Sequence, residues 1–209
     1  MYTIKEIYYT LQGEGAHTGR PAIFLRFSGC NLWSGREEDR HKAICKFCDT
    51  DFRGTNGERG GKYTAIEIAE HILDLWPSDE DIHPYVVCTG GEPLLQLDAE
   101  LCVTLHKKQI EIAIETNGTL PVPDNIDWVC MSPKANTKIV VQNGNEIKIV
   151  FPQAGIDPSS FKDWDFQHFF IQPMDGPSLA SNIEDCIQYC TQHPQWKLSV
   201  QTHKLLKIP

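Results

Sequence analysis

Short apolar runs alternate with longer amphipathic stretches along the whole chain. Runs of this length are typical of strands, whereas apolar residues at a helical period are typical of helices packed on a core. The predicted strands are Lys5–Tyr9, Ala22–Phe27, Tyr85–Cys88, Glu111–Glu115, Trp128–Met131, Glu146–Phe151, Phe169–Gln172 and Lys197–Gln201. The predicted helices are Thr64–Leu75, Asp98–Lys108 and Ser178–His193. Thr64 followed by Glu67 fits a capping box at a helix start.

Alternation of strands and helices predicts a parallel sheet with crossover helices. Functional groups then lie at the carboxyl ends of the strands. Five predicted strands do end in polar or glycine-rich segments, although loops are often polar without having a function. These segments are Ser28-Gly29-Cys30, Thr89-Gly90-Gly91-Glu92-Pro93, Thr116-Asn117-Gly118, Ser132-Pro133-Lys134 and Gln172-Pro173-Met174-Asp175.

Composition narrows the class of protein. The chain has 209 residues, enough for one sizeable domain with its own core. A net charge of -9 argues against a sequence-independent nucleic-acid binder, which needs a basic surface. We expect a cytoplasmic protein, because the segment Met1–Glu6 lacks the apolar region of a signal peptide and no apolar run is long enough for a membrane span.

Cys30, Cys45 and Cys48 are the most informative of the eight cysteines. Fourteen residues separate the first two and two residues separate the second pair. Soft thiolates select zinc, copper(I) or an iron–sulfur centre, and three of them leave one metal position open. Gly29 would let the backbone approach a bulky cluster. A zinc site completed by His41 is the alternative.

The other five cysteines are better explained by packing than by chemistry. Cys88 and Cys130 lie inside apolar strands, and Cys102 lies on the apolar side of a helix, where free cysteine is commonly buried. Cys186 and Cys190 are one helical turn apart and could hold a second metal. They have no partner cysteines nearby, so core packing is favoured.

A cysteine triad that ends in Cys-x-aromatic-Cys and is followed by Gly-Gly-Glu-Pro resembles the radical S-adenosylmethionine (SAM) superfamily. The usual spacing in that superfamily has three residues between the first two cysteines, whereas here Asn31 to Ile44 intervene. This expanded spacing resembles the 7-carboxy-7-deazaguanine synthases of queuosine and 7-deazapurine biosynthesis. The resemblance extends from Gln12-Gly13-Glu14-Gly15 to Pro209.

The resemblance implies an α/β fold, an incomplete (β/α)6-type partial barrel with a modified cluster loop. It implies a single core domain over residues 1–209 with a cluster-loop insertion at 31–44, often as a homodimer. The implied enzyme is a carbon–nitrogen lyase in which three cysteines hold a [4Fe–4S] cluster and SAM binds the open iron. The cluster donates an electron, SAM is cleaved and a 5′-deoxyadenosyl radical forms.

The implied reaction converts 6-carboxy-5,6,7,8-tetrahydropterin into 7-carboxy-7-deazaguanine with loss of ammonia. Hydrogen is abstracted from the carbon that bears the carboxylate, and SAM is regenerated. Mg²⁺ is the implied metal cofactor, and a flavodoxin-type protein is the implied external electron donor.

The resemblance also assigns the cofactor sites. Cys30, Cys45 and Cys48 are the cluster ligands, and Thr50 is the Mg²⁺ ligand that the substrate carboxylate would complete. The SAM-binding residues are Phe47, Cys48, Asp49, Gly91, Ser132, Pro133, Lys134, Gln172, Pro173, Met174 and Asp175. From the residues alone, an ordinary strand-to-helix turn at Gly91, a solvated Lys134 and a plain loop hydroxyl at Thr50 remain open.

The substrate-binding residues implied by the resemblance are Leu11, Gln12, Gly13, Glu14, Arg26, Thr89 and Pro209. Gln12 and Glu14 can bind the donor and acceptor edge of a pterin-like ring, and Arg26 can clamp a carboxylate with two hydrogen bonds. A surface ion pair is the alternative for Arg26. The apolar end of the chain at Pro209 suggests docking, and the resemblance places its carboxylate in the substrate site.

Two other functions stay open at this point. One is an activating enzyme that makes a glycyl radical on a partner protein, although the cysteine spacing and the Gln12–Gly15 motif argue against it. The other is a zinc-binding structural or interaction module.

Overall fold

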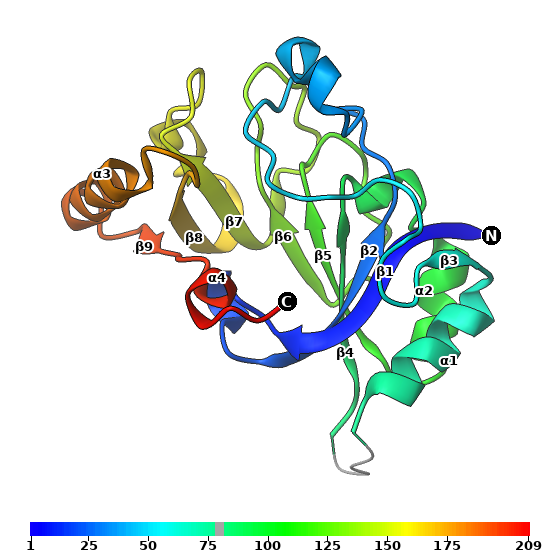
Figure 1. Cartoon of the computed structure of the whole chain (residues 1–209). Helices are drawn as coiled ribbons and strands as arrows, with labels where there is room; N and C mark the ends of the chain where they lie inside the picture. The colour runs from blue at the N-terminus through cyan, green and yellow to red at the C-terminus, as the bar shows by residue number, and fades with distance from the viewer. Residues whose placement is uncertain (78–81) are drawn as a thin grey trace.

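A single mixed sheet forms the frame of the molecule in the computed structural model, which describes residues 1–77 and 82–209. The strand order is β3-β1-β2-β4-β5-β6-β7-β8-β9 (Figure 1). The strands are β1 (Tyr2–Leu11), β2 (Pro21–Phe27), β3 (Gly61–Tyr63), β4 (Tyr85–Gly90), β5 (Glu111–Thr116), β6 (Trp128–Met131), β7 (Asn143–Phe151), β8 (Asp165–Pro173) and β9 (Lys197–Leu198).

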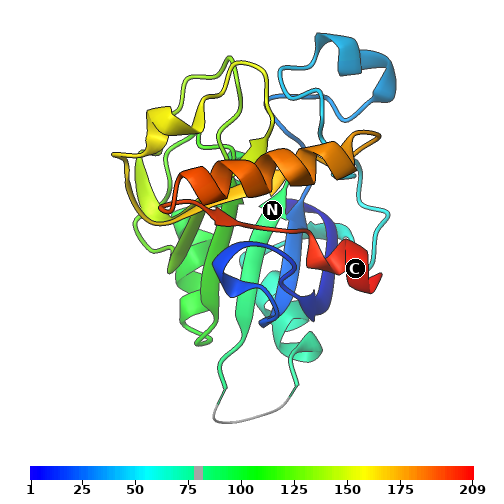
Figure 2. The same ribbon diagram turned by 90° about the vertical axis from the view of Figure 1, so that its left-hand side faces the viewer.

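Helices cover one face of this sheet, with α1 and α2 at one end and α3 at the other (Figures 1 and 2). The α-helices are α1 (Ala65–Leu75), α2 (Ala99–His106), α3 (Leu179–Gln192) and α4 (Thr202–Leu206). The 3-10 turns are η1 (Gly15–His17), η2 (Glu37–Lys42), η3 (Pro93–Leu95) and η4 (Pro158–Phe161). The predicted capping box is confirmed, since the Thr64 hydroxyl accepts from Glu67 N at 3.3 Å and the Glu67 carboxylate accepts from Thr64 N at 2.7 Å.

The predicted α/β class and the incomplete barrel are confirmed, because the sheet is open and ends in β3 and β9. From β2 to β9 every neighbouring pair of strands is parallel, so their carboxyl ends share one edge. The β5–β6 and β6–β7 connections, residues 117–127 and 132–142, contain no helix, so the β/α repeat is irregular there.

The prediction of a parallel sheet is wrong for β1, which pairs antiparallel with β2 and with β3. The connection from Leu11 to Pro21 is too short for the crossover that parallel pairing requires. The predicted strand Lys197–Gln201 is also too long, since pairing ends at Leu198. Neither β3 nor α4 was predicted, because both are shorter than the pattern can detect.

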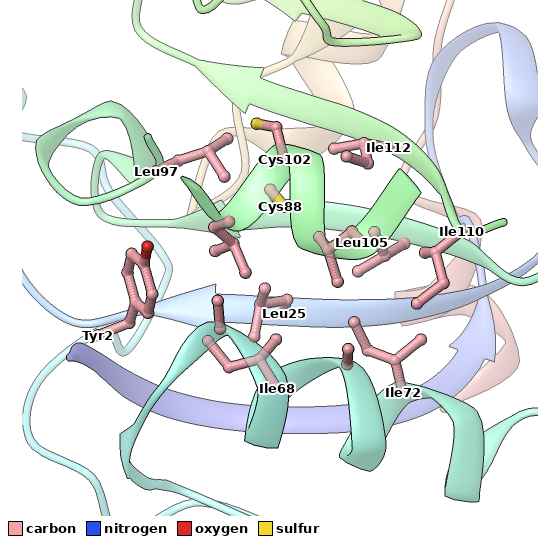
Figure 3. Packing of buried hydrophobic residues seen from close by; sticks show 14 of the residues in the cluster. Tyr2, Leu25, Ile68, Ile72, Cys88, Leu97, Cys102, Leu105, Ile110 and Ile112 are labelled. Atoms are coloured by element: carbon pink, nitrogen blue, oxygen red, sulfur yellow. The ribbon is translucent and has the colours of Figure 1, made fainter. Parts of the chain in front are cut away.

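The main core lies between the sheet and helices α1 and α2. Ile68 and Ile72 of α1 and Leu105 of α2 point at Leu25 and its neighbours on the sheet (Figure 3). A second core packs α3 on β7 and β8 and includes Cys186. Among the cysteines expected in cores, Cys88, Cys102, Cys130 and Cys186 are buried and Cys190 is half-buried. No described helix is long and apolar enough to cross a membrane.

Replacement of Ile68 by Ala tests the main core. Ile68 is 0% exposed, so we expect the free energy of unfolding to fall by about 2–5 kcal/mol in a urea titration. Ile66→Ala in the same helix is the matched control, because Ile66 is 62% exposed and its loss should change stability by less than about 0.5 kcal/mol. Equal effects of the two substitutions would contradict this packing.

Candidate active site

A cavity of about 520 Å³ opens at the carboxyl ends of the parallel strands. It brings together most of the residues that the sequence singled out. Those that line it are Leu11, Gln12, Gly13, Glu14, Arg26, Cys30, Cys45, Phe47, Cys48, Asp49, Thr50, Thr89, Gly91, Ser132, Lys134, Gln172, Pro173, Asp175 and Pro209. Pro133 and Met174 do not line it. Their carbonyls accept hydrogen bonds from Gln153 and Asn182, so they support the wall from behind.

The three cysteines of the triad lie on one wall of this cavity. Cys45 is buried, and Cys30 and Cys48 are half-buried. A hydrogen bond between the Cys45 and Cys48 thiols lowers the pKa of Cys48 to about 6 and raises that of Cys45. Cys30 Sγ accepts from Leu32 N at 3.4 Å. At least one thiol therefore ionises readily, as a metal ligand must.

The arrangement of the triad bears on which metal group it fits. In residues 1–77 and 82–209, no three His, Cys, Asp or Glu side chains lie close enough together to hold a single metal ion. His41 is exposed on η2 and does not line the cavity. In an iron–sulfur cluster each thiolate binds a different iron, so the ligands stand further apart. The triad thus fits a cluster better than a zinc ion completed by His41.

The turn after β4 lies directly against the loop that carries Cys30. A Cβ atom on Gly91 would stand 2.6 Å from Cys30 Cβ and would also overlap the carbonyl oxygen of Gly29. Only glycine therefore allows this close approach. As a result, the backbone of the glycine turn lies beside Cys30. A ligand bound next to this cysteine would contact that backbone.

Glu92 holds this turn in place from inside the protein. Its carboxylate is buried and accepts from Thr116 Oγ1 and from Asn117 N, both at 2.8 Å. Its own N–H donates to the Gly29 carbonyl at 3.0 Å. Burial raises the pKa of Glu92, whereas these hydrogen bonds oppose the rise. One residue thus ties together the ends of β2, β4 and β5.

Lys134 is a wall residue of the cavity and is not a solvated loop lysine. Its ammonium donates to the carbonyl and to the hydroxyl of Ser132, each at 2.7 Å. Burial lowers the pKa of Lys134, while Cys45 and Cys48 raise it. A positive charge at this place can bind a carboxylate beside the thiols.

A charged network around Lys148 lines another part of the cavity. Lys148 Nζ lies 2.6 Å from Glu14 Oε2 and 3.5 Å from Glu115 Oε1. Gln12 Nε2 also donates to Glu115, at 3.2 Å. Lys148 and Glu115 were not predicted as site residues. The detectable signal is a lysine between Ile147 and Ile149, in the apolar second half of β7.

Arg26 lies in this cavity and not on the outer surface. Its Nε donates to Glu6 Oε1 at 2.7 Å, and its Nη2 donates to the Tyr8 hydroxyl at 2.9 Å. Arg26 does form the ion pair of the alternative, with Glu6, but its side chain is 15% exposed and the pair lies in the cavity. Glu6 and Tyr8 hold one edge of the guanidinium and orient it.

The segment that contains α4 and ends at Pro209 docks at the cavity and contributes to its lining (Figure 1). Thr202 donates through N and Oγ1 to the Gly13 carbonyl, both at 2.9 Å, and Gln201 Nε2 donates to Glu14 at 2.9 Å. Thr10 Oγ1 donates to an oxygen of Pro209 at 3.1 Å. Gln201, His203 and Lys204 line the cavity and were not predicted; the apolar tail signalled only that the segment docks.

Comparison with known proteins agrees with this geometry. The family model described as "Radical SAM superfamily" matches residues 41–136. A 7-carboxy-7-deazaguanine synthase of Burkholderia multivorans is 58% identical over 209 residues, covering 100% of this chain and 99% of that protein. One of Bradyrhizobium diazoefficiens is 55% identical over 208 residues, with 99% of each covered. The crystal structure of QueE from Escherichia coli has a TM-score of 0.69 and 28% identity, covering 96% of this chain and 93% of that one.

The open α/β sheet with a cysteine triad beside a glycine turn defines a radical SAM enzyme. Full-length relatives at 50–58% identity narrow this class to one family. The chain belongs to the 7-carboxy-7-deazaguanine synthase family.

The ion pair of Glu14 with Lys148 predicts a dependence of stability on pH. Burial alone would raise the pKa of Glu14, but the charge and hydrogen bond of Lys148 outweigh burial and lower it from 4.5 to about 2. Because the folded pKa is the lower one, the pair stabilises fully above about pH 4.5 and loses its contribution as the pH falls toward 2. In urea titrations of metal-free protein, Glu14→Gln should therefore lose stability less steeply than wild type over this range.

The matched control for this pH series is Glu38→Gln, since Glu38 pairs with Arg36 at 3.4 Å on the surface. It should follow the wild-type slope. A Glu14→Gln slope equal to that of wild type would contradict the assigned pair.

Proposed function

We propose that this protein converts 6-carboxy-5,6,7,8-tetrahydropterin into 7-carboxy-7-deazaguanine, with Cys30, Cys45 and Cys48 as ligands of a [4Fe–4S] cluster. The observation that carries the proposal is the content of one cavity. One part of its lining holds three thiols beside a glycine turn, and another part holds the charged network around Lys148 together with Arg26. The relatives' name supplies the product, and the cavity supplies residues suited to both reactants.

Residues next to the triad would hold SAM against the cluster. Backbone carbonyls of the turn at Gly91 suit the SAM ammonium, and Lys134 with Ser132 suits its carboxylate or ribose hydroxyls. Gln172, which accepts from Ser199 Oγ at 2.9 Å, lies where the adenine would be framed. When bound, the cluster and SAM supply a one-electron cleavage that yields the carbon radical for hydrogen abstraction.

The residues around Lys148 and Arg26 would bind and orient the pterin. Gln12 and Glu14 offer donor and acceptor groups to its ring edge, and Arg26 offers a fork of N–H groups to its carboxylate. Lys148 keeps Glu14 ionised, so that this carboxylate accepts hydrogen bonds. The docked tail lines the cavity and would limit the access of water, which would protect a radical from side reactions.

Thr50 is the proposed Mg²⁺ ligand. It lines the cavity directly after the triad, and the neighbouring Asp51 accepts from the buried Lys5 at 2.6 Å. Mg²⁺ keeps several waters and accepts few protein oxygens, so a substrate carboxylate would have to complete the site. The donor set thus fits a metal that binds together with the substrate.

The external electron donor and the homodimer stay predictions. Cys30 and Cys48 are only half-buried, which supports the transfer of an electron to the triad from an external donor. Exposed apolar side chains on α4, Leu205 at 75% and Leu206 at 62%, support a face that a second copy could cover.

The direct test is turnover by the anaerobically reconstituted protein with SAM, reductant and the carboxytetrahydropterin. We expect mass spectrometry to detect 7-carboxy-7-deazaguanine together with visible iron–sulfur absorbance. Bound zinc without that absorbance would contradict the radical assignment. SAM cleavage with untouched pterin would contradict the substrate and would favour the glycyl-radical-activating alternative.

Deletion of Pro209 should reduce turnover of the pterin more than cleavage of SAM. Because Pro209 lines the cavity and is a proposed substrate contact, we expect turnover of the pterin to fall about tenfold or more while uncoupled SAM cleavage stays within about twofold. High-performance liquid chromatography of both products measures the ratio. Equal loss of both activities would exclude a specific substrate role for this residue.

Thr50→Val should raise the Mg²⁺ concentration needed for half-maximal turnover by about tenfold, because valine keeps the shape and removes the oxygen. Ser28→Ala is the control, since the Ser28 hydroxyl donates to the Gly54 carbonyl and neither residue lines the cavity. An unchanged Mg²⁺ requirement in the Thr50 variant would remove this residue from the metal site.

A further inference from the structure

The inserted segment 31–44 folds back on the cysteines that flank it. It forms the loop around η2 that projects above the sheet (Figures 1 and 2, light blue). Ile44 N donates to the Leu32 carbonyl at 3.0 Å and closes the base of the loop. Trp33 and Ala43 pack on Phe52 in a small core. Cys30 and Cys48 contact the edge of this core, so the insertion is in direct contact with the triad.

Arg40, in η2, reaches from the insertion to the Cys45–Cys48 turn. Its Nη1 donates to the carbonyl of Lys46 at 2.9 Å and to the carbonyl of Cys48 at 3.1 Å. The guanidinium lies over the Trp33 ring, 4.1 Å from its centre. Its Nε donates to Glu37 Oε1 at 2.7 Å. The arginine is thus held from two sides while it binds the two carbonyls on either side of Phe47.

Two physical effects follow from this placement. Hydrogen bonds from a charged donor are strong and fix the backbone of the turn, and therefore the direction of the Cys48 side chain. Guanidinium also stays charged at every relevant pH, so it adds a positive charge beside the turn that carries Cys45 and Cys48. A positive charge favours the reduced, more negative state of a nearby cluster.

We propose that Arg40 is a positioning residue for the cluster, and that the insertion serves to hold it there. Through the Lys46 and Cys48 carbonyls it orients Cys48, and through its charge it raises the reduction potential. This inference rests on the proposed function, because it assumes that the triad holds a [4Fe–4S] cluster. It gives the insertion a role within the site that is independent of any docking partner.

The test compares Arg40→Met and Arg40→Lys with Arg36→Met in the reconstituted full chain. Arg36 is the matched control, because it belongs to the same loop, is 58% exposed and pairs only weakly with Glu38 at 3.4 Å. The measurements are the rate of iron loss to a chelator and the midpoint potential from a spectroscopic redox titration. A residue that merely stabilised the loop would leave the potential unchanged.

We expect Arg40→Met to lose iron about 10–100-fold faster than wild type and to have a more negative midpoint potential. Arg40→Lys, which keeps the charge but not the planar fork, should recover the potential and lose iron faster than wild type. Arg36→Met should match wild type in both measurements.

The inference is overturned if Arg40→Met matches Arg36→Met in either measurement. If Arg40→Met does not fold, Arg40→Lys against Arg36→Lys decides, and equal rates of iron loss in that pair overturn the inference. A wild-type protein that binds no [4Fe–4S] cluster would instead refute the proposed function on which the inference rests.

Discussion

The buried carboxylate of Glu92 is the interaction on which the geometry of the site depends. It accepts from Thr116 and Asn117 after β5, while its own N–H donates to Gly29 after β2. Three strand ends are thereby fixed to one another in the plane of the sheet. Because Gly91 precedes this residue, the glycine turn has no freedom to move away from Cys30. The relative position of the thiols and the glycine-turn backbone is thus set by a hydrogen-bonded group in the protein interior.

Lys148 is a second buried charge, and it organises the part of the cavity around Glu14 and Glu115. Lys148 lies between Glu14 and Glu115, and removal of Lys148 would leave both carboxylates without their shared positive charge. The tail contacts the same region, since Gln201 donates to Glu14. Lys204 in the tail also binds Asp49 at 2.6 Å and Asp175 at 2.5 Å. Asp49 follows the triad and Asp175 follows β8, so the tail connects both sides of the cavity.

Much of this arrangement could be predicted because it is local in sequence. The strands that precede Gly29, Gly91 and Ser132 are visible as apolar runs followed by polar residues, and parallel pairing brings those ends together. Other features depend on tertiary distance alone. No pattern along the chain pairs Lys148 with Glu14, and none indicates that Arg40 reaches the Cys48 carbonyl. The antiparallel direction of β1 is not visible in the apolar pattern, because it follows from the short connection between Leu11 and Pro21.

The most direct measurement is a crystal structure of the anaerobically reconstituted protein with SAM and the carboxytetrahydropterin. We expect iron anomalous signal bounded by Cys30, Cys45 and Cys48, with the SAM ammonium at the Gly91 turn and the pterin carboxylate at Arg26. A zinc signal at the triad, or SAM bound outside this cavity, would contradict the account.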